Sequence, residues 1–202
     1  QILVERKFHR TLDRIALGLG NITVIGGDAF AYSSLESVIL PETLITIQKE
    51  AFYHSNFQNI IIPASVEFIG NAAFADTPIE SLVFADNSSL KVIEQSAFEL
   101  TEKLSGTVEI PASVTTLGRA VFRASAVSSV VFEEGSIITE IPEEAFADSG
   151  ITVFTAPNSV TKIGDGAFRG AKSLKAFNYG DGELWLGANA FYQSGLEAFH
   201  IK

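Results

Sequence analysis

The sequence predicts an α/β-type repeat solenoid, in which short coils stack on one another and share one core. Three observations lead to this prediction. A pattern ending in phenylalanine, such as Ile25-Gly-Gly-Asp-Ala-Phe30, recurs along the chain. A second pattern, apolar-x-x-apolar-x-apolar, follows each phenylalanine, as in Leu35-x-x-Val38-x-Leu40. Apolar residues make up 47% of the chain, which is enough to fill such a core.

The phenylalanines are the most regular feature, at intervals of 22 to 24 residues: Phe30, Phe52, Phe74, Phe98, Phe122, Phe146, Phe168 and Phe191. We expect their rings to stack as an internal spine. Acidic residues before the phenylalanine, such as Asp28 and Glu50, suit the first turn of a helix. We therefore expect short helical or 3-10 turns, or short strands, on the convex side. The glycine after the isoleucine, as in Gly70, suits a tight corner where φ can be positive.

The second pattern predicts β-strands. Its last two apolar residues are two positions apart, so both face inward and the residue between them faces outward. One unit is too small to bury its own apolar face, but stacked units bury it together and align their strands in a parallel sheet. Proline often follows the strand, as at Pro41 and Pro63, and ends it because proline has no N–H.

The repeats extend over the whole chain, so residues 1–202 are predicted to form one domain. Residues 22–202 hold about eight repeats of 22–24 residues. Residues 1–21 are interpreted as a degenerate first repeat, or alternatively as a short amphipathic capping helix. The chain begins at Gln1 and ends just after Ile201 without a capping segment. We therefore expect it to be a piece of a longer protein.

Three fragments are similar to a known repeat: Ile62-Pro-Ala-Ser-Val66, Ile110-Pro-Ala-Ser-Val114 and Pro157-Asn-Ser-Val-Thr-Lys-Ile-Gly164. They resemble the BspA-like, Treponema-type leucine-rich repeat, strongly over residues 22–202 and weakly over residues 1–21. The resemblance implies a right-handed leucine-rich-repeat superhelix with its parallel sheet on the concave face. It also implies an exported protein, extracellular or at the cell surface, that attaches to host or extracellular-matrix proteins. Family members often have cysteine after the phenylalanine, where this chain has Ser33, Ser55 and Thr77.

The residues that usually carry chemistry are missing or scattered. The chain has no cysteine, which excludes disulfides, thiolate catalysis and sulfur-ligated metals. His9, His54 and His200 lie at least two repeats apart and are predicted to be solvated. The adjacent carboxylates Glu133-Glu134 and Glu143-Glu144 are also predicted to be solvated. We therefore expect no enzymatic activity, no cofactor and no metal.

Charge and hydropathy limit the kinds of partner. A net charge of −10 repels the phosphate backbone, so nucleic acid is not an expected partner. No stretch approaches the roughly 18–20 apolar residues that a membrane span needs, so no membrane insertion is expected. The oligomeric state stays open.

Outward residues of the predicted strands form columns across the sheet. One column contains the consecutive aliphatic residues Ile39, Ile61 and Val83, and the column beside it contains small polar residues. An exposed apolar stripe with a polar rim is typical of a protein-binding face, although β-branched residues also simply favour strands. The predicted partner-binding residues are Ser37, Ile39, Asn59, Ile61, Ser81, Val83, Thr107, Glu109, Ser129 and Val131. Phe68 and Trp185 occupy equivalent positions and are expected to face outward on the convex side.

The predicted function is a non-catalytic protein–protein interaction module of a secreted or surface-displayed protein, with adhesion or host-protein binding through the concave sheet. One alternative is a structural spacer or self-associating arm in a multidomain secreted protein. A carbohydrate-binding module is the other alternative, but the predicted concave face has almost no aromatic residues.

Overall fold

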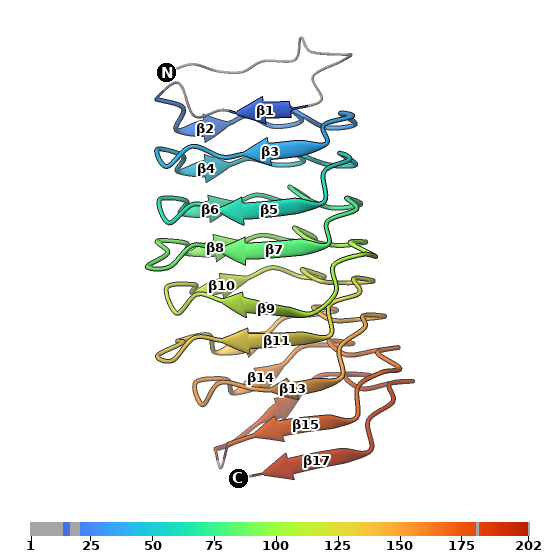
Figure 1. Cartoon of the computed structure of the whole chain (residues 1–202). Coiled ribbons are helices and arrows are strands. Elements are labelled where there is room, and N and C mark those ends of the chain that lie inside the picture. Colours follow the sequence, from blue (N-terminus) through green and yellow to red (C-terminus); the bar gives the residue numbers. More distant parts are fainter. Residues whose placement is uncertain (1–13, 17–20, 181, 202) are drawn as a thin grey trace.

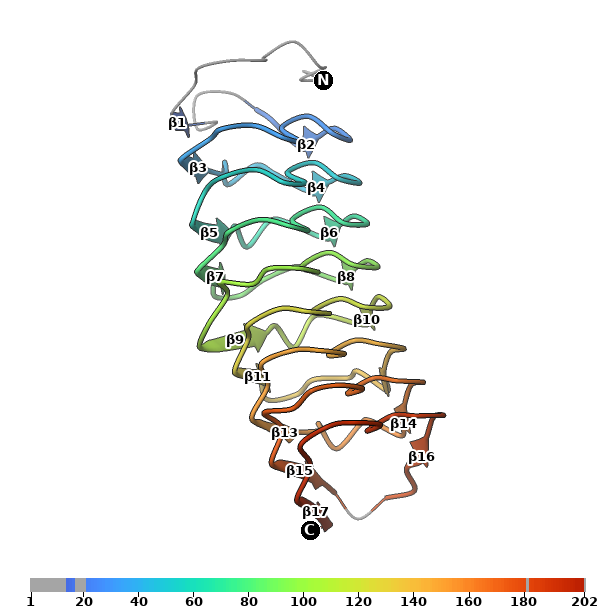
Figure 2. The ribbon, with the colours of Figure 1, turned by 90° about the vertical axis from the view of Figure 1, so that its right-hand side faces the viewer.

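A computed structural model describes residues 14–16, 21–180 and 182–201. Within these residues the chain winds into a stack of coils, from β1 at one end to β17 at the other (Figure 1). Each coil contributes one longer and one shorter strand. The longer and the shorter strands lie on separate sides of the stack (Figure 2).

The longer strands have three or four residues each: β1 (Arg14–Ala16), β3 (Ser37–Ile39), β5 (Asn59–Ile62), β7 (Ser81–Phe84), β9 (Thr107–Ile110), β11 (Ser129–Phe132), β13 (Val153–Thr155), β15 (Ala176–Tyr179) and β17 (Ala198–Ile201). The shorter strands have two residues each: β2 (Val24–Ile25), β4 (Thr46–Ile47), β6 (Phe68–Ile69), β8 (Val92–Ile93), β10 (Thr116–Leu117), β12 (Glu140–Ile141), β14 (Lys162–Ile163) and β16 (Trp185–Leu186).

All strand pairs are parallel, and each joins neighbouring coils. The longer strands form three ladders, which are β1-β3, β5-β7 and β9 through β17. The shorter strands form two ladders, β2 through β10 and β12 through β16. Along β5 and β9 exposed and buried residues alternate, as the period of two predicts. The structure confirms the predicted solenoid of stacked coils with parallel strands.

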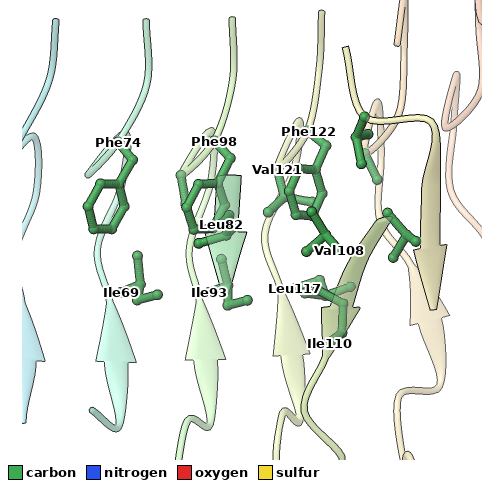
Figure 3. Packing of buried hydrophobic residues seen from close by; sticks show 14 of the residues in the cluster. Ile69, Phe74, Leu82, Ile93, Phe98, Val108, Ile110, Leu117, Val121 and Phe122 are labelled. Carbon is green, nitrogen blue, oxygen red and sulfur yellow. The ribbon is translucent and has the colours of Figure 1, made fainter. Parts of the chain in front are cut away.

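The phenylalanine spine is also confirmed. Successive rings from Phe30 to Phe191 stack nearly parallel, with centroids 5.2 to 5.8 Å apart and interplanar angles of 3 to 15°. Figure 3 shows Phe74, Phe98 and Phe122 aligned in successive coils, each above an aliphatic residue of a shorter strand. The spine and the inward aliphatic residues of both strand types form one continuous core.

The expected helical or 3-10 turn before each phenylalanine is wrong, because the described residues contain no helix. The short strands, which the sequence allows as the alternative, occur just before this segment. The segment itself is a series of turns. Around each spine phenylalanine two residues have positive φ, one two positions before it and one two positions after it. In the first coil these are Asp28 (φ 55°) and Tyr32 (φ 58°).

Positive φ at these two positions lets the backbone bond alternately within its coil and to the next coil. The N–H of Ala31 donates to the carbonyl of Asp28 in the same turn, at 3.2 Å. The N–H of Phe30 donates to the carbonyl of Ala51 in the next coil, at 2.8 Å. A 3-10 helix would use every N–H locally, so it could not join the coils in this way.

The corner glycines also differ from expectation. Gly70, Gly118, Gly164 and Gly187 are not among the residues with positive φ. A Cβ atom at each would instead lie only 2.2 to 2.6 Å from a backbone nitrogen of the preceding coil. Glycine is required there because successive backbones approach too closely for a side chain.

The first repeat is described only in part. Arg14–Ala16 form β1, which pairs with β3 in the register that the repeat predicts, Ile15 opposite Val38. The alternative of a capping helix concerns residues 1–13 and 17–20 of that repeat, which lie outside the described residues. Across the described part of the chain, no helix has the length and apolarity that spanning a membrane requires.

Candidate binding surface

The longer strands lie side by side along the stack (Figure 1), and we call the surface of their outward residues the long-strand face. Strand register aligns its residues in the predicted columns. Asn59 lies opposite Ser81, and Ile61 lies opposite Val83. Thr107 lies opposite Ser129, and Glu109 lies opposite Val131. The structure thus places these predicted residues on one face, and their role in binding stays a prediction.

Three aliphatic side chains dominate one half of this face. Ile39, Ile61 and Val83, which we call the aliphatic stripe, are 63%, 62% and 47% exposed. They come from three successive coils, and β3 contacts β5 although no ladder joins them. Ser37, Asn59 and Ser81 run alongside the stripe. The stripe is therefore a continuous apolar surface with a polar rim.

The other half of the face is more mixed. Glu109 follows the stripe in the same column and separates it from the exposed Val131. Ser129 and Val131 line a hollow of about 590 Å³ that extends between β11 and β13. The charge of Glu109 therefore confines the uninterrupted apolar surface to the three coils of the stripe.

Both carboxylates of the pair Glu143-Glu144, which was expected to be solvated, instead contact arginines, and Glu143 lies 3.1 Å from Arg119. Glu144 lies 2.8 Å from Arg119, 3.0 Å from Arg169 and 3.6 Å from Arg123, and its side chain is 15% exposed. A hydrogen bond to Glu99 and the nearby carboxylates raise the pKa of Arg123, against the effect of partial burial. Because Glu99, Glu143 and Glu144 each contact an arginine of a neighbouring coil, this network fits the linking of coils and not acid–base catalysis.

The sequence analysis missed a cluster that we call the aromatic corner: Tyr32, Tyr53, His54 and Asp76. Tyr32 packs against both Tyr53 and His54, with centroids 5.4 and 5.2 Å apart. His54 is not simply solvated as expected, since its Nδ1 lies 2.6 Å from Asp76 Oδ2. Desolvation raises the pKa of Tyr53, and the neighbouring Tyr32 and Asp76 raise it further.

The sequence does contain a signal for the aromatic corner, which is the spacing of its residues. Tyr32, His54 and Asp76 are each 22 residues apart, which is one coil, and each lies two positions after a spine phenylalanine. Comparing equivalent positions between coils would have found them. The histidines alone do not reveal the corner, because they lie at least two coils apart.

The aromatic residues of the shorter strands and the histidines complete the set of predicted residues. Trp185 faces outward as expected, 52% exposed, with Lys162 Nζ 5.2 Å from its ring centroid. Phe68, in the equivalent position of β6, is half-buried. His9 lies outside the described residues. Of the residues that the structure does describe, no three His, Asp or Glu side chains come together as metal ligands would.

Stacked coils with two ladders of parallel strands and a phenylalanine spine define a solenoid repeat protein. The BspA type leucine-rich repeat region, in six copies, matches residues 23–149 and 139–202. The chain therefore belongs to the BspA-type leucine-rich repeat family. Among curated proteins, none matches the chain.

Solved structures of similar fold come from bacteria. The pneumococcal vaccine antigen PcpA is 25% identical, with a TM-score of 0.64 over 90% of this chain and 48% of its own. A leucine rich cell surface protein from Faecalibacterium prausnitzii is 24% identical, with a TM-score of 0.57 over 94% of this chain and 59% of its own. The chain thus spans less than two thirds of either structure.

Proposed function

We propose that this chain is a non-catalytic module that binds a protein partner outside the cell, through the aliphatic stripe of the long-strand face. The observation that carries the proposal is the exposure of Ile39, Ile61 and Val83 on three successive coils. Solvent-exposed aliphatic side chains in a continuous row are unfavourable in water and favour association. The family resemblance and the likeness to a pneumococcal vaccine antigen support a location at the surface of a bacterium.

The chemistry of the stripe defines the kind of partner that fits it. Covering one isoleucine side chain contributes roughly 1.5–3 kcal/mol. Ser37, Asn59 and Ser81 offer hydroxyl and amide groups for the rim of an interface. The matching surface is an apolar segment of a matrix or host protein, flanked by polar groups. The net charge of −10 favours partners with basic surroundings.

The test is binding to immobilised collagen, laminin and fibronectin, measured for the unmodified chain and for Ile61→Glu. We expect the unmodified chain to bind at least one of them. A buried charge in place of the isoleucine should weaken that binding by about 10- to 100-fold. The free energy of unfolding should change by less than about 1 kcal/mol, because the side chain is exposed.

Thr155→Glu is the matched control. Thr155 lies in the same outward column as Ile61, on β13, and is exposed, but it is far from the stripe. This variant should bind as the unmodified chain does. Equal binding by both variants, or no binding to any of the three matrix proteins, would exclude the proposed function.

A further inference from the structure

A hollow of about 550 Å³ opens at the corner between the phenylalanine turns and the longer strands of four successive coils. Tyr32, His54, Asp76 and Leu100 each lie two residues after a spine phenylalanine and line it at equivalent positions. With coils about 4.8 Å apart, these four positions span roughly 14 Å. The hollow can therefore hold a ligand of several rings.

One end of the hollow is aromatic. Tyr32 is 66% exposed, yet its ring has a fixed support because Tyr53 meets it edge-on at an interplanar angle of 80°. His54 lies beside both tyrosines. The exposed ring face of Tyr32 is a flat apolar surface that is held in place before a ligand arrives. Such a surface suits the C–H face of a sugar ring, which is likewise flat and apolar.

The other end is polar, with both donors and acceptors. Asp76 Oδ2 accepts a hydrogen bond from His54 Nδ1 at 2.6 Å. This bond fixes the orientation of both side chains. Asn56, Glu102 and Lys103 also line the hollow. A sugar hydroxyl donates and accepts at once, so it can use the carboxylates, the ammonium and the amide together.

The mixed charges favour a neutral ligand. Asp76 and Glu102 would repel an anionic ligand, and Lys103 offsets the attraction of these carboxylates for a cationic ligand. The apolar residues of the hollow, Tyr32, Pro78 and Leu100, alternate with polar residues, so the hollow lacks the continuous apolar surface that a partner of the aliphatic stripe needs. A short neutral oligosaccharide combines the required ring faces and hydroxyls.

We propose that the hollow between Tyr32 and Lys103 is a saccharide-binding site, with a sugar ring on Tyr32 and its hydroxyls on Asp76, Asn56 and Lys103. The site is separate from the aliphatic stripe and does not depend on the function proposed for it. A carbohydrate-binding module needs exposed aromatic side chains. In the described part of the chain, the long-strand face has almost none, but Tyr32, with Tyr53 packed against it, supplies one at this corner.

The test is binding of the unmodified chain to an array of neutral oligosaccharides, followed by titration calorimetry with the best ligand. Removing the ring in Tyr32→Ala should weaken binding about tenfold. Asp76→Asn should also weaken it about tenfold, since a charged acceptor is lost. Both side chains are at the surface, so the melting temperatures should stay within a few degrees.

Two controls make the outcome specific. Tyr192→Ala removes another exposed tyrosine, in the coil of Phe191 and outside the hollow, and should bind sugar normally. Ile61→Glu should also bind sugar normally, which distinguishes this site from the stripe. Absence of any bound glycan, or glycan binding that survives both Tyr32→Ala and Asp76→Asn, overturns the proposal. Loss of matrix-protein binding in Tyr32→Ala without any glycan binding would make the hollow a protein site instead, and also overturns it.

Discussion

Asp28, Glu50 and Ala72 occupy the same place in successive coils, two residues before the phenylalanine, and each has φ between 51 and 56°. A side chain with Cβ destabilises this left-handed conformation by roughly 1–2 kcal/mol. Glycine avoids this destabilisation. Its greater conformational freedom in the unfolded chain offsets about 0.4–1 kcal/mol of the gain. We therefore predict that Ala72→Gly raises the free energy of unfolding by about 0.5–1 kcal/mol, measured from the urea midpoint at unchanged slope.

Ala73 is the matched control for this prediction. It is the next residue, it is not among those with positive φ, and it is fully buried. Ala73→Gly should lower the free energy of unfolding by about 1–2 kcal/mol, through the lost methyl group and the added chain entropy. Similar destabilisation in both variants would contradict the role assigned to the left-handed position.

A substitution at Gly118 tests whether the backbones of successive coils approach too closely for a side chain. A Cβ atom there would lie 2.2 Å from the backbone nitrogen of Gln95, and the backbone of a packed coil cannot move aside easily. We predict that Gly118→Ala lowers the free energy of unfolding by about 3 kcal/mol or more. Gly27→Ala should lower the free energy of unfolding much less, because its Cβ atom would lie 3.3 Å from the carbonyl oxygen of Lys49, a close contact that a shift of a few tenths of an ångström relieves. Thermal melting followed by circular dichroism compares the two, and equal melting temperatures would contradict the explanation.

The turns are the elements that sequence reasoning failed to predict. Alanine and acidic residues before the phenylalanine resemble the start of a helix, and their composition does not reveal positive φ. The coil of Phe168 is the one whose sequence indicates positive φ, because Gly166 and Gly170 occupy its two left-handed positions. Asn189 and several aspartates at the same positions in other coils agree, because Asn and Asp tolerate this conformation better than most residues.

The strands, in contrast, were predictable residue by residue. An apolar period of two distinguishes Ile60 and Ile62, which are buried, from Ile61, which is exposed. The long-strand face could therefore be read from the sequence. The aromatic corner could not, because Tyr32 and His54 meet only through the conformation of turns whose geometry was unknown.

The spine is a second element with a measurable contribution. Phe98 stacks on Phe74 and Phe122, both at 5.4 Å, and Phe84 meets it edge-on. Because Phe98 is fully buried, Phe98→Ala should lower the free energy of unfolding by about 3–5 kcal/mol. Phe199→Ala, at a position that is 39% exposed, should lower it by less than about 2 kcal/mol. Urea unfolding of both variants measures the difference, and equal losses would argue against a continuous spine.

At the scale of the molecule, the strand pairs, ring stacks and ion pairs of the described residues join each coil to its neighbours. The strand pairs and the stacked rings of the spine link positions 22 to 24 residues apart, and the arginines around Glu144 link positions 21 to 25 residues apart. Stability in such a stack is approximately a sum over coils and over the interfaces between them. The two proposed binding sites lie within the coils of Phe30 to Phe98. They should therefore be independent of coils farther along the stack.

Removal of one complete coil tests this independence. Deleting residues 147–168 joins Phe146 to Arg169, so the repeat continues in phase and β12 can pair with β16. We predict a folded protein that melts cooperatively at a lower temperature, because one coil of core is lost. Binding at the aliphatic stripe and at the hollow beside Tyr32 should stay unchanged.

The control is a deletion of half a coil, residues 147–157. It removes β13 and places Gly164, Asp165 and Gly166, from the turn before Phe168, where a longer strand belongs, so inward and outward positions no longer match those of the neighbouring coils. This variant should lose its cooperative melting transition and its far-ultraviolet β signal from the C-terminal coils. If the two deletion variants instead lose their melting transitions to the same extent, coupling along the stack reaches beyond neighbouring coils. In that case the two binding sites are not independent of the coils farther along the stack.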